Sequence, residues 1–149
     1  MISIFLVLWI GYAIIEGYRE AYYWFFWLNS SLPNVSSKIN LHKTFAAQRA
    51  VVNIILSIGV YYITNSLFYA SLISIASDLI FSFFHNGMMY LTRNNISKKY
   101  TPDNIIYKKR WFDQSGDSTA LSTKLMSPIS RTIQAIIGLI IYVIVFSLG

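Results

Sequence analysis

The stretch AIIEGYREAYYWFFW, from Ala13 to Trp27, places three charged residues between an unbroken apolar run and a block of aromatic residues. The apolar run starts at residue 1, and Glu16, Arg19 and Glu20 follow it after about 23 to 29 Å of helix. Tyr and Trp side chains favour the boundary between hydrocarbon and water. We therefore expect these charges to mark the edge of a membrane and one wall of a shared polar site.

The composition of the whole chain supports a membrane setting. Of 149 residues, 55% are hydrophobic and 12% are charged, and the mean hydropathy is +0.50. A soluble domain carries about twice that share of charge. Four apolar blocks approach the roughly 20 residues of helix that cross a bilayer. They predict an all-α fold, an integral membrane four-helix bundle forming one domain over residues 1–149, with spans at about 1–20, 49–67, 67–84 and 128–148.

The distribution of charge predicts the topology of this bundle. The connection between the second and third spans carries no charge, whereas the segment from residue 93 to residue 131 is strongly basic. Short basic loops stay in the cytoplasm, so we expect the positive-inside pattern to place cytoplasmic loops at about 29–40 and 95–127. Both chain ends then lie outside, and helices 1 to 3 extend into the cytoplasm. The basic residues are Arg93, Lys98, Lys99, Lys108, Lys109, Arg110, Lys124 and Arg131.

Local signals mark helix starts and packing surfaces. Ser127 followed by proline predicts the start of the last helix. Small residues let membrane helices approach closely, and they predict a packing seam on the third helix (Ala70, Ser74, Ser77) and another on the fourth (Arg131, Ala135, Gly138). The first apolar block has no basic residue before it and no small-x-small cleavage site, so we expect a retained helix.

The segment DNIIYKKRWF combines apolar residues with a basic run. This pattern is typical of a helix that lies on the inner leaflet and contacts anionic lipid headgroups. The predicted membrane-surface contacts are Lys108, Lys109, Arg110 and Trp111. An ordered basic loop is the alternative. Nucleic acid is not an expected partner, because anionic lipid is the commoner partner of such a segment beside a bilayer.

The ionisable residues of the four helices all fall in the inner half of the predicted bundle. A charge at the bilayer centre costs roughly 2.5 to 3.5 kcal/mol, so such residues survive where they meet water or one another. We expect the acids to pair with Arg19, Arg49 and Arg131. The predicted polar cluster contains Glu16, Arg19, Glu20, His42, Arg49, Asp78, His85, Asn86, Arg93 and Arg131.

Three classes of function are compatible with this cluster. The favoured one is a structural or interaction component of a bacterial inner membrane or a phage-associated membrane, with a protein partner or a homo-oligomer. The second is a metal-dependent hydrolase acting on a lipid-linked ester or phosphate, with Arg49 or Arg93 holding the anionic group. Its divalent metal would be held by carboxylates and imidazoles suited to zinc, manganese or iron: Glu16, Glu20, His42, Asp78 and His85.

The third class is a holin-like pore or a small transporter subunit. No acidic stripe runs through the full depth of the membrane, as a hydrated cation path would usually need. The metal hypothesis lacks a diagnostic spacing such as HExxH. The chain has no cysteine, which excludes disulfides, thiolate metal sites and cysteine nucleophiles. The common nucleotide-binding and serine hydrolase motifs are absent as well. A bacterial or phage origin is suggested by the heavy use of Ile, Asn, Lys, Ser and Tyr, which AT-rich codons encode.

Overall fold

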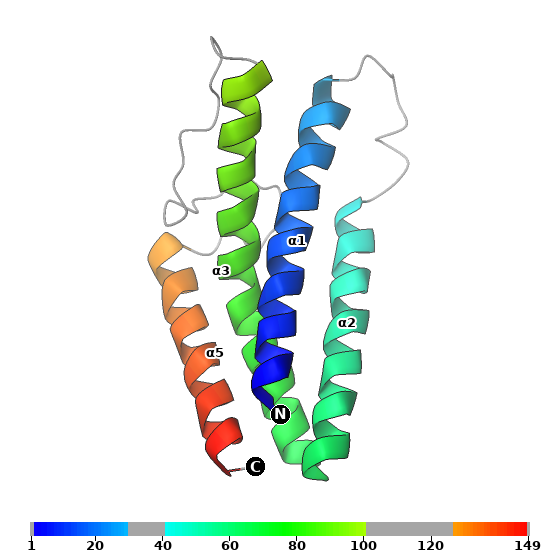
Figure 1. Ribbon diagram of the computed structural model, residues 1–149, viewed down its shortest axis with the longest axis vertical. Helices are drawn as coiled ribbons and strands as arrows, with labels where there is room; N and C mark the ends of the chain where they lie inside the picture. Colours follow the sequence, from blue (N-terminus) through cyan, green and yellow to red (C-terminus); the bar gives the residue numbers. More distant parts are fainter. Residues whose placement is uncertain (1, 30–40, 101–126, 149) are drawn as a thin grey trace.

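The computed structural model describes residues 2–29, 41–100 and 127–148, and nearly all of them are helical. The four helices are α1 (Ile2–Asn29), α2 (Leu41–Thr64), α3 (Leu67–Tyr100) and α5 (Pro128–Leu148). Figure 1 shows α1 and α3 running in one direction and α2 and α5 in the other. The start of α1, the end of α5 and the α2–α3 connection therefore lie at one end of the bundle. The all-helical prediction is confirmed for the described ranges.

Helix α3 is the centre of the arrangement, because it packs against each of the other three helices. Its most extensive contacts are with α1 and α5, while α2 packs mainly on α3 and meets α1 at few points. In Figure 1, α2 and α5 lie on opposite sides of the α1–α3 pair. The core of the α3–α5 side is formed by fully buried side chains such as Ile73, Ile80 and Val145.

Three of the helices are long and apolar enough to cross a membrane. The corresponding segments are Thr44–Thr64, Leu67–Tyr100 and Ile129–Leu148. Large apolar side chains also cover the outside of the bundle: Val7 is 68% exposed and Val143 is 61% exposed. Continuous apolar surface of this kind marks contact with lipid or with other proteins. The structure is therefore compatible with a membrane protein, and a fourth crossing by α1 stays a prediction.

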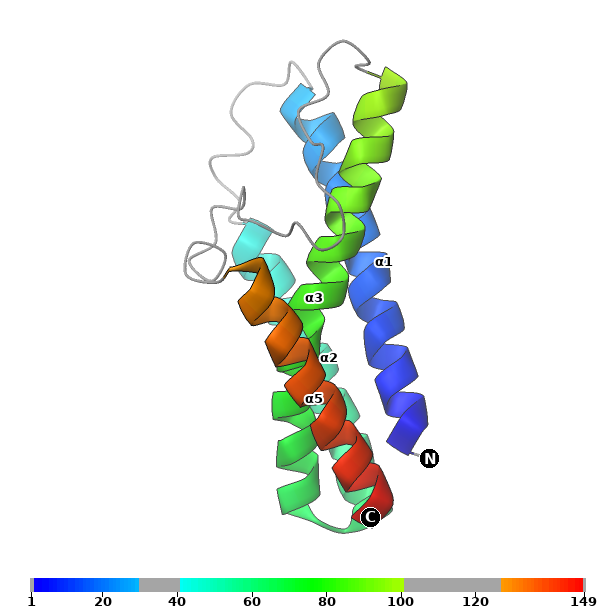
Figure 2. The same cartoon turned by 90° about the vertical axis from the view of Figure 1, so that its left-hand side faces the viewer.

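Helices α1 and α3 are longer than a bilayer core requires. With 28 and 34 residues, they measure about 42 and 51 Å at 1.5 Å per residue, against a hydrocarbon core of about 30 Å. Figures 1 and 2 show both helices extending past α2 and α5 at the end opposite to the α2–α3 connection. The structure thus continues both helices beyond the predicted span ends at about residues 20 and 84.

The helix ends follow from local hydrogen bonds. Helix α2 stops where Asn65 adopts a left-handed conformation with φ 49°, which asparagine tolerates better than most residues. Ser66 then caps α3, because its Oγ accepts a hydrogen bond of 3.4 Å from the Tyr69 amide. At the start of α5, Ser127 Oγ accepts one of 3.2 Å from the Ser130 amide. The cap predicted at Ser127 is thus confirmed.

Two glycines set the closest helix crossings. A Cβ atom on Gly17 of α1 would overlap the main-chain carbonyl oxygen of His85 on α3. A Cβ atom on Gly138 of α5 would lie 2.7 Å from the carbonyl oxygen of Ala76 on α3. Ala135 is 4% exposed on the same side of α5, so the seam predicted on this helix is buried. The helices approach here because these positions carry no side chain.

The α1–α3 crossing yields a test of the fold. Replacing Gly17 with Ala forces α1 away from the backbone of α3, and we expect the midpoint of thermal unfolding in detergent to fall by several degrees. A matched control is Gly11→Ala, because a Cβ atom on Gly11 meets nothing within 4 Å. That change improves helix propensity by up to about 1 kcal/mol and should leave the midpoint unchanged or slightly higher. Equal midpoints for the two variants would contradict the close crossing.

Candidate functional site

Two carboxylates of α1 and one guanidinium of α2 form the centre of a polar cluster. Glu16 and Glu20 lie one turn apart and are only 2% and 5% exposed. Arg49 reaches both of them, with its Nε 2.8 Å from Glu16 Oε1 and its Nη2 3.3 Å from Glu20 Oε2. The side chain of Arg49 is 31% exposed, so the cluster is buried on the α1 side and reaches the surface through α2.

Helix α3 contributes an imidazole to the same cluster. His85 Nε2 lies 2.8 Å from Glu20 Oε2, and His85 Nδ1 lies 2.9 Å from Asn86 Oδ1. Arg49 Nη2 lies 3.3 Å from His85 Nε2, so Glu20, Arg49 and His85 meet at one point. We call Glu16, Glu20, Arg49 and His85 the ion-pair cluster.

An aromatic ring separates the ion-pair cluster from the apolar core. Phe81 lies one turn before His85 on α3 and stacks on its ring, with centroids 5.0 Å apart and planes inclined by 22°. The guanidinium carbon of Arg49 lies 4.6 Å from the centroid of the same Phe81 ring. Such a cation–π contact adds about 0.5 to 2 kcal/mol, depending on how far the charge is removed from water. The ring therefore holds Arg49 in position between α1 and α3.

Helical spacing explains why these side chains converge. Glu16 and Glu20 are four residues apart, as are Phe81 and His85, so each pair lies on one side of its helix. Gly17 falls between the two glutamates and lets the backbone of α1 approach His85. The short distance between the α1 and α3 axes brings Glu20 within reach of the imidazole. Gly17 is therefore part of the site although it carries no functional group.

Other residues of the predicted cluster lie elsewhere in the structure. Arg19 is exposed, donates a hydrogen bond of 3.0 Å to Gln48 Oε1 and lies 5.3 Å from the Phe45 ring centroid. Asp78 is exposed and accepts a hydrogen bond of 2.8 Å from Asn53 Nδ2, two turns from His85. The acid is thus not among the carboxylates that Arg49 contacts.

The remaining predicted residues are placed as follows. Asn86 is buried and belongs to the cluster through His85. Arg131 is 1% exposed near the start of α5, and Arg93 is half-buried on α3, two turns beyond His85. The side chain of His42 lies outside the described part of the structure, and so do the membrane-surface residues Lys108, Lys109, Arg110 and Trp111.

A second polar link was not predicted from the sequence. Trp9 of α1 is fully buried and donates a hydrogen bond of 2.7 Å to the main-chain oxygen of Ser77 on α3. The Ser77 hydroxyl lies 2.8 Å from the Tyr142 hydroxyl of α5. A signal was present, because tryptophan favours membrane boundaries and Trp9 stands within an apolar run. A tryptophan at such a position points to a buried hydrogen-bond partner.

The fold and the ion-pair cluster define a class: a helical bundle with three helices able to cross a membrane and a cluster of charged groups that joins three of its helices. No protein-family model, curated protein or solved structure matches the chain.

The stability of the cluster can be measured by removing its shared cation. Arg49→Gln leaves Glu16 and Glu20 buried without a positive partner from α2. Breaking a fully buried pair costs about 3 to 5 kcal/mol, and we expect about 2 to 3 kcal/mol because Arg49 is partly exposed. The matched control is Arg19→Gln, which removes an exposed hydrogen bond and should cost less than about 1 kcal/mol. Thermal unfolding in detergent measures both, and similar losses would show that the carboxylates are solvated.

Proposed function

We propose that this chain is an integral membrane protein that crosses the bilayer four times and serves as a structural or interaction component of its membrane. Three helices with the length and hydropathy of membrane spans support insertion. The antiparallel arrangement of α1 and α3 against α2 and α5 supports an even number of crossings, with the start of α1 and the end of α5 on one side. The basic residues Arg93, Lys98 and Lys99 toward the opposite end of α3 favour the cytoplasm for that end, which would leave both chain ends outside. The heavy use of Ile, Asn, Lys, Ser and Tyr, which AT-rich codons encode, favours a bacterial inner membrane or a phage-associated membrane.

The observation that carries the structural role is that the ion-pair cluster joins three helices. Arg49 contacts both glutamates, and Glu20 contacts His85 as well. Charges that satisfy one another across three helices fix the depth and order of those helices in a membrane. The interior of the described helices is filled by side chains such as Trp9, Ile80 and Tyr142, so a pore would have to form between copies of the chain.

Because the chain has no cysteine, its topology can be tested with single introduced thiols. Leu67 at the start of α3 is 73% exposed, and Lys99 near the end of α3 is also exposed. We expect a membrane-impermeant maleimide added to intact cells to label Leu67→Cys. Lys99→Cys should react only after the membrane is permeabilised. The reverse pattern would invert the topology, and equal labelling of both in intact cells would contradict a membrane crossing by α3.

Metal binding is a second candidate, favoured by one specific observation. Glu16, Glu20 and His85 each offer a ligand atom, and these atoms lie within 4.8 Å of one another. Two carboxylates and one imidazole resemble the three protein ligands of a catalytic zinc site, which leaves a position for water. Arg49 opposes metal binding, because its guanidinium contacts both carboxylates. A metal would therefore have to displace Arg49 toward the surface.

This competition predicts opposite effects of two substitutions on zinc affinity. In calorimetric titration of the detergent-purified protein with Zn²⁺, Arg49→Gln should bind at least about tenfold more tightly than the wild type, although it unfolds more easily. His85→Ala should bind at least about tenfold more weakly, because a ligand is lost. Asp78→Asn serves as the control and should leave the affinity unchanged. Weak and equal binding by all four proteins would remove the metal hypothesis and, with it, the hydrolase.

A further inference from the structure

Asp78 is a carboxylate that faces outward from the α2–α3 side of the bundle. It is exposed, and within the described helices it accepts one hydrogen bond, from the amide of Asn53 on α2. The same Asn53 nitrogen donates to the main-chain oxygen of Ser74 at 3.2 Å. Asn53 is neutral, so it orients Asp78 without balancing its charge. The ion-pair cluster does not include this carboxylate.

The position of Asp78 along α3 makes its exposure costly. It lies eleven residues after Leu67, or about 16 Å from the start of the helix. On the proposed membrane insertion, on which this inference rests, that places the carboxylate near the middle of a hydrocarbon core about 30 Å thick. Acidic side chains at such depth almost always face a cavity or a partner charge. The outward face of α2 and α3 therefore needs a partner for the Asp78 carboxylate.

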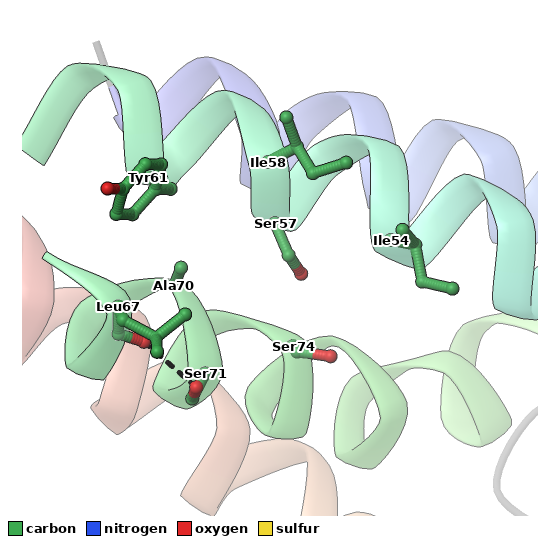
Figure 3. Close-up of a pocket in the computed structure, with 8 residues that line it drawn as sticks. All are labelled: Ile54, Ser57, Ile58, Tyr61, Leu67, Ala70, Ser71 and Ser74. Carbon is green, nitrogen blue, oxygen red and sulfur yellow. Dashed lines mark hydrogen bonds between the residues drawn. The ribbon is translucent and has the colours of Figure 1, made fainter. Parts of the chain in front are cut away.

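A groove with a volume of about 340 Å³ lies on the same side of the bundle, and its lining ends at Ser74, one helical turn before Asp78. Figure 3 shows that it lies between α2 and α3. In this view Ser57 of α2 and Ala70 of α3 point into the space between the two helices. Ser57 and Ser71 bond to carbonyl oxygens of their own helices, each at 2.8 Å. The walls thus offer little to a polar ligand and suit the apolar ridge of another helix.

The charges of the chain itself argue against a second copy as the occupant. In a two-fold dimer that buries this face, with its axis along the membrane normal, Asp78 would face another Asp78 or Asn53. The basic side chains of the described helices lie nearer the opposite end of the bundle, and the one closest to this level, Arg49, already contacts two glutamates. Like charges at close range are unfavourable. A cation at the depth of Asp78 must therefore come from a different chain.

We propose that the α2–α3 face binds a transmembrane helix of another protein, which lays an apolar ridge in the groove and pairs a Lys or Arg with Asp78. The carboxylate would give the contact its specificity, because an unpaired charge on either helix is penalised in hydrocarbon. The small side chains of the groove would set the separation of the helices.

Two model peptides test this pairing in phosphatidylcholine vesicles. One is a single-span polyleucine helix with one central Lys, and the other is the same helix without it. Energy transfer from labelled protein to labelled peptide measures association. We expect the Lys peptide to associate at least tenfold more strongly with the wild type. Asp78→Asn should abolish this preference, and Asp78→Glu should retain much of it. Filling the groove with Ser71→Leu, at an exposed position, should weaken binding of the Lys peptide.

Several outcomes overturn the inference. Equal association of the two peptides with the wild type would do so, as would a preference that survives in Asp78→Asn. If energy transfer between two labelled copies of the protein is present in the wild type and lost in Asp78→Asn, Asp78 serves a homo-oligomer instead. Resistance to carbonate extraction reports insertion separately: a protein that is extracted contradicts the proposed function, whereas an inserted protein with no preference for Lys contradicts this inference alone. Circular dichroism verifies that each variant keeps its helix content.

Discussion

Two carboxylates removed from water require a positive partner, and this requirement organises how α1 and α2 meet. Glu16 and Glu20 lie one turn apart, so a single guanidinium spans both. That guanidinium belongs to α2, which otherwise meets α1 at few points. Leaving either acid buried and unpaired would cost several kcal/mol. The position of α2 relative to α1 is therefore set by charge compensation, whereas its packing area lies mainly on α3.

Two polar links at different depths share the α1–α3 pair. The ion-pair cluster adds α2 to this pair, and the hydrogen bonds from Trp9 through Ser77 to Tyr142 add α5. Close contact at Gly17 is a condition for the first link, because it brings α1 within reach of His85. The outer helices thus attach independently to opposite sides of a common core. Directional contacts of this kind complement packing, since lipid provides no hydrophobic drive for helix association.

The sequence predicted the helices and the depth of their charges better than the direction in which the side chains point. The depth of a residue in the bundle follows from the helical rise of 1.5 Å per residue and from the alternating direction of the helices. Glu16, Arg49 and His85 could therefore be assigned to one level. Direction depends on which neighbour a helix meets at each level. Asp78 and His85 lie on nearly the same side of α3, about 20° apart, yet Asp78 contacts only Asn53 of α2 among the described side chains, whereas His85 contacts Glu20 of α1 and Arg49 of α2. Because the two residues share one side of α3, their spacing predicted a single polar cluster, whereas the structure separates Asp78 from His85.

Other differences between the predicted and the observed side-chain contacts also have local causes. Arg19 is turned by about 60° from Glu16 and by about 100° from Glu20 around the helix axis, and it contacts Gln48. The hydrogen bond of Trp9 goes to a backbone oxygen, which side-chain patterns do not encode. Whether the ion-pair cluster binds a metal stays a prediction, as do the roles assigned to Arg93 and Arg131. The cap at Ser127 and the buried seam of α5 were predictable, because both depend on residues close in sequence.

The connection between α2 and α3 consists of Asn65 and Ser66 only, and this shortness has a consequence for biosynthesis. On the proposed membrane insertion, two helices joined so tightly enter the bilayer as one hairpin, with the bond between Asn53 and Asp78 able to form inside it. The helix that precedes them leaves the ribosome first and carries Glu16 and Glu20 without their cation. Its stable integration must then wait for the hairpin that delivers Arg49, which makes the order of synthesis part of how the bundle assembles.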